Sequence, residues 1–344
     1  MALQSEFDRL QTAWRALASD GVTEGWRTIP IELLGPQRLL AGRHFPGNEE
    51  AVLVGFNSVR LPLEGQLPQG QGFRVERIKH KISDVSHTWI ALSRQPVGSL
   101  DMFARMAEDV VGMLEVYRHV EDQVLFQLFL GRIKAWQEFM HQARAEVLGP
   151  EAETGLAGEL CFLKSLLETG LPATTVLDGW HGPLNGLHDF LFGLGAIEVK
   201  STVATLGFPA TIGSLEQLDA SLVTPLFLAG VRLVLDPGGM TLPAIIDDIL
   251  RELEDKPEAR GKFESLVLRT GFLRAFSDRY RRRFALADIR ILLIDGAFPA
   301  LTRNNVNPVI RKVRYELDLD LVSASDVGMD CAFEQLGVLN NGTR

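Results

Sequence analysis

Turn-forming residues divide the first 95 residues into short apolar runs. Gly, Pro and Asn recur between these runs, as in Pro46-Gly47-Asn48. Apolar runs of this kind between turn residues are typical of β-strands, so the pattern predicts a β-rich module over residues 1–95. The predicted strands cover residues 28–34, 38–41, 51–56, 73–78 and 88–93.

A helical period replaces this pattern between residues 96 and 148. Apolar positions such as Leu100, Phe103 and Ala107 recur at spacings of three and four, which places them on one face of an α-helix. Gly149-Pro150 follows, and this pair is a common helix stop. We therefore expect residues 96–148 to form a helical connector.

Helical and strand patterns alternate over residues 149–322, which is typical of an α/β domain. A helix is predicted over residues 153–168, and a Gly193-Leu194-Gly195 turn joins two of the predicted strands. Residues 323–344 remain as a C-terminal tail. The predicted strands cover residues 174–177, 187–192, 196–201, 226–235, 289–294 and 313–321, and further helices are expected at residues 242–254, at residues 260–284 and from Ser214 onward.

The composition is that of a folded protein. Of the 344 residues, 46% are hydrophobic and 23% are charged, a balance that excludes wholesale disorder. Two cysteines, Cys161 and Cys331, are too few for a disulfide framework or a four-cysteine zinc site, and they favour a reducing compartment. We expect a cytoplasmic protein with no membrane partner, because no apolar run approaches the ~20 residues of a membrane span and the N-terminus does not resemble a secretion signal.

Charge is distributed unevenly along the C-terminal half of the chain. The net charge is −9, but residues 151–258 carry −11 and residues 259–314 carry +9. A carboxylate-rich segment beside a basic one suits a metal-dependent enzyme that acts on a polyanion. Two solvated surfaces of opposite sign would give the same numbers, because segments of sequence need not form patches in space.

Three carboxylates and a lysine are the strongest candidates for chemistry. Side chains alternate along a strand, so Glu198 and Lys200 point to the same side. Asp189 lies on the strand across the glycine turn, within reach of Glu198. Two carboxylates so close repel each other unless a cation lies between them, and oxygen ligands suit Mg²⁺ or Mn²⁺. Glu159 borders the buried face of its helix and can reach the same ion. A salt-bridged Glu198–Lys200 pair on a wetted strand is the alternative.

These residues resemble a known nuclease signature. Asp189 followed by Glu198-Val199-Lys200 is similar to the PD-(D/E)XK motif, and Glu159 matches the accessory acid of many members. The residue before Asp189 is His188, where the motif expects proline. The wider pattern resembles a bacterial family of unknown function within the same superfamily. The likeness is carried by Gly155–Leu160, Trp180-His181-Gly182-Pro183, His188-Asp189-Phe190, Ile197–Thr202 and Ser214–Asp219.

The resemblance implies a restriction-endonuclease-like core, a mixed sheet flanked by helices, over residues 149–322. It implies that Mg²⁺ or Mn²⁺ is held by Glu159, Asp189 and Glu198 together with the carbonyl of Val199. Lys200 would position or deprotonate the attacking water. Genes of such families tend to lie near restriction or anti-phage genes, which implies a defence role beside other subunits such as a methyltransferase, a helicase or an ATPase.

Other polar residues are candidates for supporting roles. Gln217 matches a position that several nuclease lineages use to hold the site or to touch phosphate, although a capping or surface role is equally open. His181 and His188 flank the site in sequence without a partner at metal-ligand spacing, and a structural role explains them.

Two basic runs are candidates for binding DNA phosphates. Arg279, Arg282 and Arg283 fall at spacings of three and four, so a helix could present them on one side. Arg311 and Lys312 lie in a second run that contains no acid. Arginine suits bidentate phosphate contacts, but a solvated face would also explain either run.

The sequence therefore predicts a metal-dependent DNA endonuclease of a restriction or anti-phage defence system. The rival is a non-catalytic subunit that keeps the nuclease fold for DNA binding or assembly in a multi-protein complex, and an RNA-directed nuclease is a third alternative. The N-terminal module and the connector would recognise a partner, a DNA feature or a second copy of the chain in a homodimer.

Overall fold

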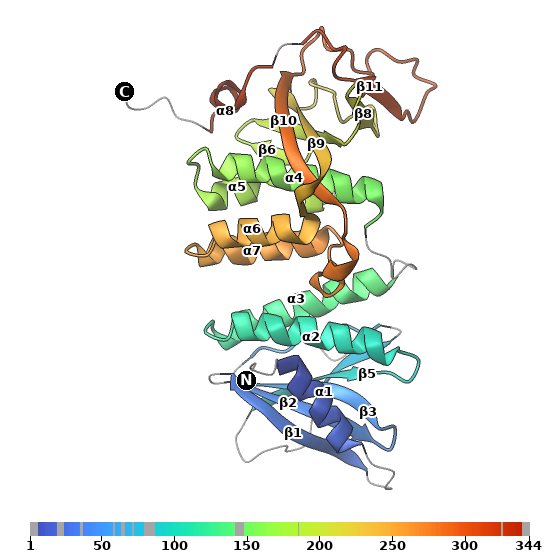
Figure 1. Cartoon of the computed structure of the whole chain (residues 1–344), viewed down its shortest axis with the longest axis vertical. Coiled ribbons are helices and arrows are strands. Elements are labelled where there is room, and N and C mark those ends of the chain that lie inside the picture. The colour runs from blue at the N-terminus through green and yellow to red at the C-terminus, as the bar shows by residue number, and fades with distance from the viewer. Residues whose placement is uncertain are drawn as a thin grey trace. The chain divides into compact units, whose positions relative to one another are not determined.

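The computed structural model describes residues 6–18, 24–34, 37–57, 59–62, 66–70, 72–78, 87–141, 148–184, 186–324 and 326–338. The chain divides into two compact units, Met1–Ala145 and Glu146–Arg344. Each unit has its own sheet and its own helices (Figure 1).

The described part of the first unit contains a five-stranded antiparallel sheet in the order β1-β2-β3-β5-β4. Each strand corresponds to one of the predicted apolar runs. Helix α1 was not predicted, although Leu10, Trp14 and Leu17 are buried at helical spacing, and the indole N–H of Trp14 donates to the Ala51 carbonyl at 2.8 Å. The elements are α1 (Glu6–Leu17), β1 (Gly25–Leu34), β2 (Gln37–Phe45), β3 (Glu49–Phe56), β4 (Phe73–Arg77), β5 (Thr88–Arg94), α2 (Leu100–Val116) and α3 (Asp122–His141).

The described part of the second unit has a mixed four-stranded sheet in the order β10-β9-β7-β6. Strands β7 and β9 are parallel, and the other neighbours are antiparallel. A second sheet pairs β8 with β11. The α/β architecture is as expected and is compatible with a PD-(D/E)XK core. The elements are α4 (Pro150–Leu167), α5 (Ala173–Gly179), β6 (Phe190–Phe192), β7 (Gly195–Thr202), β8 (Pro209–Ile212), β9 (Leu226–Thr241), α6 (Leu242–Glu252), α7 (Pro257–Arg269), β10 (Arg283–Leu293), β11 (Tyr315–Asp318) and α8 (Met329–Leu336).

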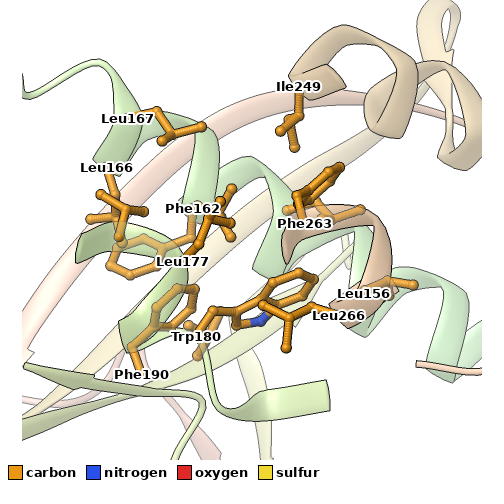
Figure 2. Close-up of a cluster of buried hydrophobic side chains, with 14 of the residues drawn as sticks. Leu156, Phe162, Leu166, Leu167, Leu177, Trp180, Phe190, Ile249, Phe263 and Leu266 are labelled. Carbon is orange, nitrogen blue, oxygen red and sulfur yellow. The ribbon is translucent and has the colours of Figure 1, made fainter. Parts of the chain in front are cut away.

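Alternation along β7 divides its side chains between two layers. Ile197 and Val199 enter the main apolar core, which the sheet shares with α4, α5, α6 and α7. Aromatic rings fill much of this core, and Phe162 of α4 meets Phe190 of β6 edge to face at 5.2 Å between ring centres (Figure 2). Ala196 faces the opposite layer, where it packs with residues of β8. Glu198 and Lys200 therefore project from the same face as Ala196.

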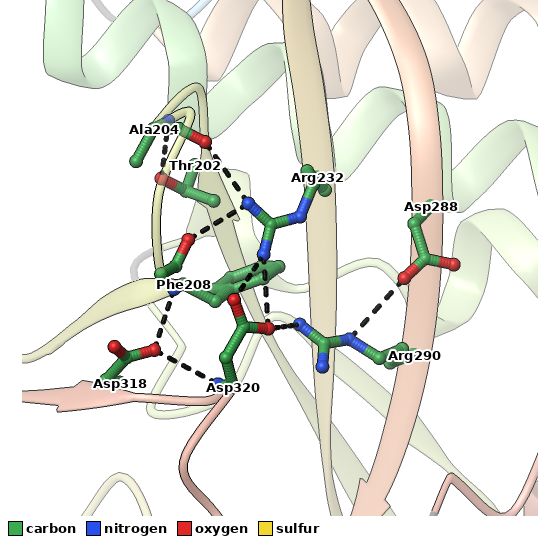
Figure 3. Close-up of polar contacts among 9 residues, drawn as sticks. Thr202, Ala204, Phe208, Arg232, Asp288, Arg290, Asp318 and Asp320 are labelled. Atoms are coloured by element: carbon green, nitrogen blue, oxygen red, sulfur yellow. Dashed lines mark hydrogen bonds and ion pairs between the residues drawn. The ribbon is translucent and has the colours of Figure 1, made fainter.

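Two arginines and one aspartate tie this opposite layer to the mixed sheet (Figure 3). Asp320, just beyond β11, accepts hydrogen bonds from Arg232 Nη2 at 3.0 Å and from Arg290 Nη2 at 2.7 Å. Both guanidinium groups stack on Phe208, with Cζ 4.9 and 5.1 Å from the ring centre. This cluster fixes the end of β11 beside β9 and β10.

Three predicted elements were wrong. Residues 174–177 belong to helix α5, where Val176 and Leu177 are buried beside α4, because a short apolar run does not distinguish a strand from a helix turn. The segment from Ser214 forms turns, in which the Gln217 Oε1 accepts the Gly213 N–H at 2.7 Å, and such local side-chain bonds compete with a helix.

The third is the end of the basic helices predicted over residues 260–284, which the structure confirms only as far as Arg269. Helix α7 ends at Arg269, a short 3₁₀ turn covers Arg274–Arg279, and strand β10 begins at Arg283. Phe284 is buried and pairs with Leu235 of β9, so sheet pairing decides this segment. Within the described residues, no helix has the length and apolar character needed to cross a membrane.

Candidate functional site

Helix α4 brings Glu159 to the sheet. A Cβ on Gly158 would overlap the Ser201 side chain of β7, so glycine lets the helix lie directly on that strand. Gly155, one turn earlier in the same helix, has no neighbour within 4 Å of its Cβ position among the described residues. Glu159 follows Gly158 and is half-buried at this contact.

The β6–β7 hairpin brings Asp189 to Glu198. Asp189 directly precedes β6, whose first residue pairs with Ile197, and Asp189 Oδ2 accepts the Val199 N–H at 2.7 Å. On β7, Lys200 Nζ lies 2.6 Å from Glu198 Oε1. The predicted shared face of Glu198 and Lys200 is confirmed by this bond.

Residues 180–182 bring Glu159 and Asp189 together. The carboxylates of both residues point at Gly182, where an added Cβ would overlap Glu159 Oε2 and lie 3.2 Å from Asp189 Oδ1. The N–H groups of His181 and Gly182 donate to the Asp189 carbonyl at 2.7 and 3.0 Å. The indole N–H of Trp180 donates to Glu159 Oε2 at 2.9 Å. The three predicted carboxylates and Lys200 thus form one cluster.

Burial and mutual repulsion raise the pKa values of these carboxyl groups. Glu198 is only 2% exposed; burial and, after it, the Asp189 charge raise its pKa to about 8, and Lys200 opposes this rise only in part. Burial also raises the pKa of Glu159 to about 8, and the Asp189 charge adds to this effect. The pKa of Asp189 is raised by burial as well, although the Val199 N–H opposes that rise. A cation between these groups would relieve the repulsion.

The donor set fits a divalent cation with oxygen ligands. Glu198 Oε2 is buried and accepts no hydrogen bond of standard geometry within the described residues, although the backbone N–H of Asp189 also lowers the pKa of Glu198. Carboxylate oxygens are the ligands that Mg²⁺ and Mn²⁺ prefer. In the described chain no three His, Cys, Asp or Glu side chains are arranged around a common point as a metal site. Oxygens of Glu159, Asp189 and Glu198 instead accept hydrogen bonds from Trp180, Val199 and Lys200.

Gln217 lies near the cluster through its backbone. Its carbonyl is 3.1 Å from Nε2 of the buried His188, which adjoins Asp189, while its side-chain Oε1 turns back to Gly213. Burial lowers the pKa of His188, in keeping with a structural role. The structure thus places the Gln217 backbone, and not its side chain, against the residue that adjoins Asp189.

The predicted phosphate-binding residues Arg279, Arg282 and Arg283 are not carried on one helix. Because the helix that would align them is absent, Arg279, Arg282 and Arg283 do not share a helical face. Arg282 Nη1 donates to the Pro150 carbonyl at 2.6 Å and lies 3.3 Å from Glu153 Oε2. Exposed residues of the predicted set are Arg279, Arg283, Arg311 and Lys312.

Sequence reasoning missed two residues that touch the cluster. Trp180 and Gly182 belong to a motif that carried the family resemblance, but nothing in the local pattern assigns them a carboxylate partner in α4. Tyr315 of β11 is close enough to feel the Lys200 charge: burial raises its pKa, while the Leu301 N–H and then the Lys200 charge oppose that rise. The alternating pattern of residues 313–321 predicted a strand without indicating which layer that strand covers.

Comparison with known proteins gives one match. A family model described as "Putative PD-(D/E)XK family member, (DUF4420)" matches residues 10–320. Neither the curated proteins nor the solved structures contain a match to the chain.

Proposed function

The chain belongs to the DUF4420 family of PD-(D/E)XK-type proteins, and from this premise we propose that its second unit is a divalent-metal-dependent DNA endonuclease. The observation that carries the proposal is the convergence of Glu159, Asp189 and Glu198 beside Lys200. Carboxylates with raised pKa values in one place are typical of functional sites, and here the motif order and the spatial cluster agree.

The residues that would hold Mg²⁺ or Mn²⁺ are Glu159, Asp189 and Glu198, with the Val199 carbonyl as a main-chain ligand. The buried Glu198 Oε2, which accepts no hydrogen bond of standard geometry within the described residues, supports this assignment. When bound, the ion would supply Lewis-acid stabilisation of charge on the phosphodiester.

Lys200 would orient the attacking water or take up its proton, because it extends from the same strand face as Glu198. Its bond to Glu198 places the ammonium group inside the cluster and away from the apolar core. Gln217 would support the site from the loop that His188 holds.

Arg279, Arg283, Arg311 and Lys312 would contact DNA phosphates. All four are exposed, whereas Arg282 is bonded to the start of α4 and would act on that helix. A basic surface is needed because the acidic segment 151–258 carries a net charge of −11, which repels a phosphate backbone.

Cleavage of supercoiled plasmid DNA tests the proposal. We expect nicked or linear product with Mg²⁺ or Mn²⁺, none with EDTA, and none from Asp189→Asn, which removes a charge with little change in shape. Product from EDTA-treated protein or from the variant would contradict the assignment. Single-stranded and duplex RNA substrates, included in the same assay, separate the RNA alternative.

A second candidate function is a non-catalytic DNA-binding or assembly subunit of a multi-protein defence complex. The favouring observation is that each predicted ligand residue already bonds to a protein group in this structure. This candidate predicts salt-dependent DNA binding without cleavage. In both candidates the first unit would recognise a partner subunit, a DNA feature or a second copy of the chain.

A further inference from the structure

Trp180 combines full burial with a polar bond to the cluster. The residue is 0% exposed, and its ring stacks on Phe263 of α7 with 6.0 Å between ring centres. Figure 2 shows the ring enclosed by core side chains, which fix its orientation. The indole N–H nevertheless ends on Glu159 Oε2 at 2.9 Å. The core of the unit therefore holds a hydrogen-bond donor at a set position beside Glu159.

Gly182 leaves the space that the carboxylates occupy. A side chain at this position would overlap Glu159 Oε2 and crowd Asp189 Oδ1, and its own N–H donates to the Asp189 carbonyl. One short segment thus contacts both acids: its tryptophan holds Glu159, and its glycine leaves room for Glu159 and Asp189 to approach.

We propose that Trp180 is a positioning residue, whose indole N–H holds the Glu159 carboxylate toward Asp189 as a ligand of the divalent cation. This inference rests on the proposed function. Indole only donates and carries no charge, so it can orient a carboxylate without neutralising it. An arginine or lysine in the same place would compete with the cation.

Outer-shell partners of metal ligands typically contribute 10–100-fold to metal affinity or activity. Calorimetric titration with Mn²⁺ should therefore show affinity reduced about 10-fold or more in Trp180→Phe, which keeps an aromatic ring but loses the N–H. Trp136→Phe is the matched control, because Trp136 is also fully buried and donates its indole N–H to a carboxylate, Asp109 Oδ2, at 2.8 Å in the first unit. Equal losses in both variants, or no loss in Trp180→Phe, would overturn the inference.

Gly182→Ala tests the placement of the Glu159 carboxylate without altering a core side chain. The added methyl group should push the flexible end of Glu159 away, with loss of Mn²⁺ affinity and little change in melting temperature. Gly155→Ala, in the same helix as Glu159 and with an open Cβ position, should leave the affinity unchanged. If Trp180→Phe does not fold, this pair of variants decides the matter: equal affinities in the two would overturn the inference.

A double-mutant cycle shows whether Trp180 acts through Glu159. In a Glu159→Gln background, Trp180→Phe should cause no further loss of affinity. A full, additive loss would mean that the tryptophan acts on the fold and not on this carboxylate.

A metal-free readout separates this inference from the proposed function. The indole N–H resonance of Trp180 is identified by its loss in Trp180→Phe, or as the one that persists when each of the other four tryptophans is replaced in turn. This resonance should move in Glu159→Gln while that of Trp136 stays in place. If wild type binds no Mn²⁺ and cuts no DNA, the proposed function fails, yet a shifted resonance still supports the positioning bond. An unchanged resonance overturns the inference whatever the protein cuts.

Discussion

At Glu198, burial and neighbouring charges act in opposite directions. The side chain is enclosed beside Asp189, which disfavours its ionised form, while Lys200 favours it from 2.6 Å. The balance leaves the pKa near 8, and Glu159 reaches the same value by burial and the Asp189 charge. The metal-free cluster therefore holds protons at neutral pH that a divalent cation would displace.

This proton uptake predicts how stability depends on pH. The folded pKa of Glu198, about 8, lies above its ordinary value of 4.5, so the folded state binds more protons than the unfolded state between these values. The free energy of unfolding contributed by this group is then fully present below pH 4.5 and is lost as pH rises toward about 8. Melting of the protein in EDTA should show a smaller decline in this window for Glu198→Gln than for wild type. Identical declines would mean that the Glu198 pKa is not raised.

Lys200 gives a second prediction at the residue scale. Lys200→Ala should reduce cleavage by about 10²–10⁴-fold, the usual contribution of a group that assists proton transfer, in a protein that is still folded. Lys164→Ala is the matched control, because Lys164 also pairs with a carboxylate, Asp248 Oδ2 at 2.5 Å, on a surface of the same unit. Normal cleavage by a well-folded Lys200→Ala protein would mean that Lys200 only forms a salt bridge with Glu198 and takes no part in cleavage.

At the scale of elements, the site depends on contacts between segments far apart in sequence. Strand alternation alone predicted that Glu198 and Lys200 share a face, and the glycine turn predicted that Asp189 lies opposite, so this half of the cluster could be derived locally. The bond from Trp180 to Glu159 could not, because it joins the end of α5 to the middle of α4. The run from Arg279 to Arg283 was wrongly predicted to be helical for a related reason. Its spacing fits a helix, but the pairing of Phe284 with β9 decides its structure.

The arginine segment yields a prediction that separates its members. Arg279→Ala with Arg283→Ala should flatten the plot of log affinity against log salt by roughly 0.9 for each phosphate of duplex DNA that the variant no longer neutralises. Arg311→Ala with Lys312→Ala should act in the same way, and both pairs should weaken all sequences equally, because phosphate contacts carry no base information. Filter binding across a salt series measures these slopes. An unchanged slope in both pairs would place the DNA path elsewhere.

Arg282 should behave differently from its neighbours. It bonds to the Pro150 carbonyl and lies beside the buried Glu153, so Arg282→Ala leaves a buried carboxylate without its partner. We expect a lower melting temperature with little change in the salt slope. A changed slope at unchanged stability would place Arg282 on the DNA after all.

For the whole molecule, sheet and helix assignments followed from the sequence more readily than the site did. Strand β3 is a continuous buried run, the first half of β9 is largely buried, and α4 has a clear apolar stripe. The net charge of −11 over residues 151–258 did not predict the site, because the net charge of a segment does not say which carboxylates lie together. The structure brings together Glu159, Asp189 and Glu198, which are 39 positions apart from first to last in the numbering.

The central claim is that these three carboxylates form a divalent-cation site. Calorimetric titration of Mn²⁺ into wild type and Asp189→Ala tests it most directly, with melting curves to show that both proteins are folded. We predict one or two ions bound to wild type and loss of that binding in the variant, because paired carboxylates need a cation between them. Equal Mn²⁺ binding by the two proteins would contradict the claim.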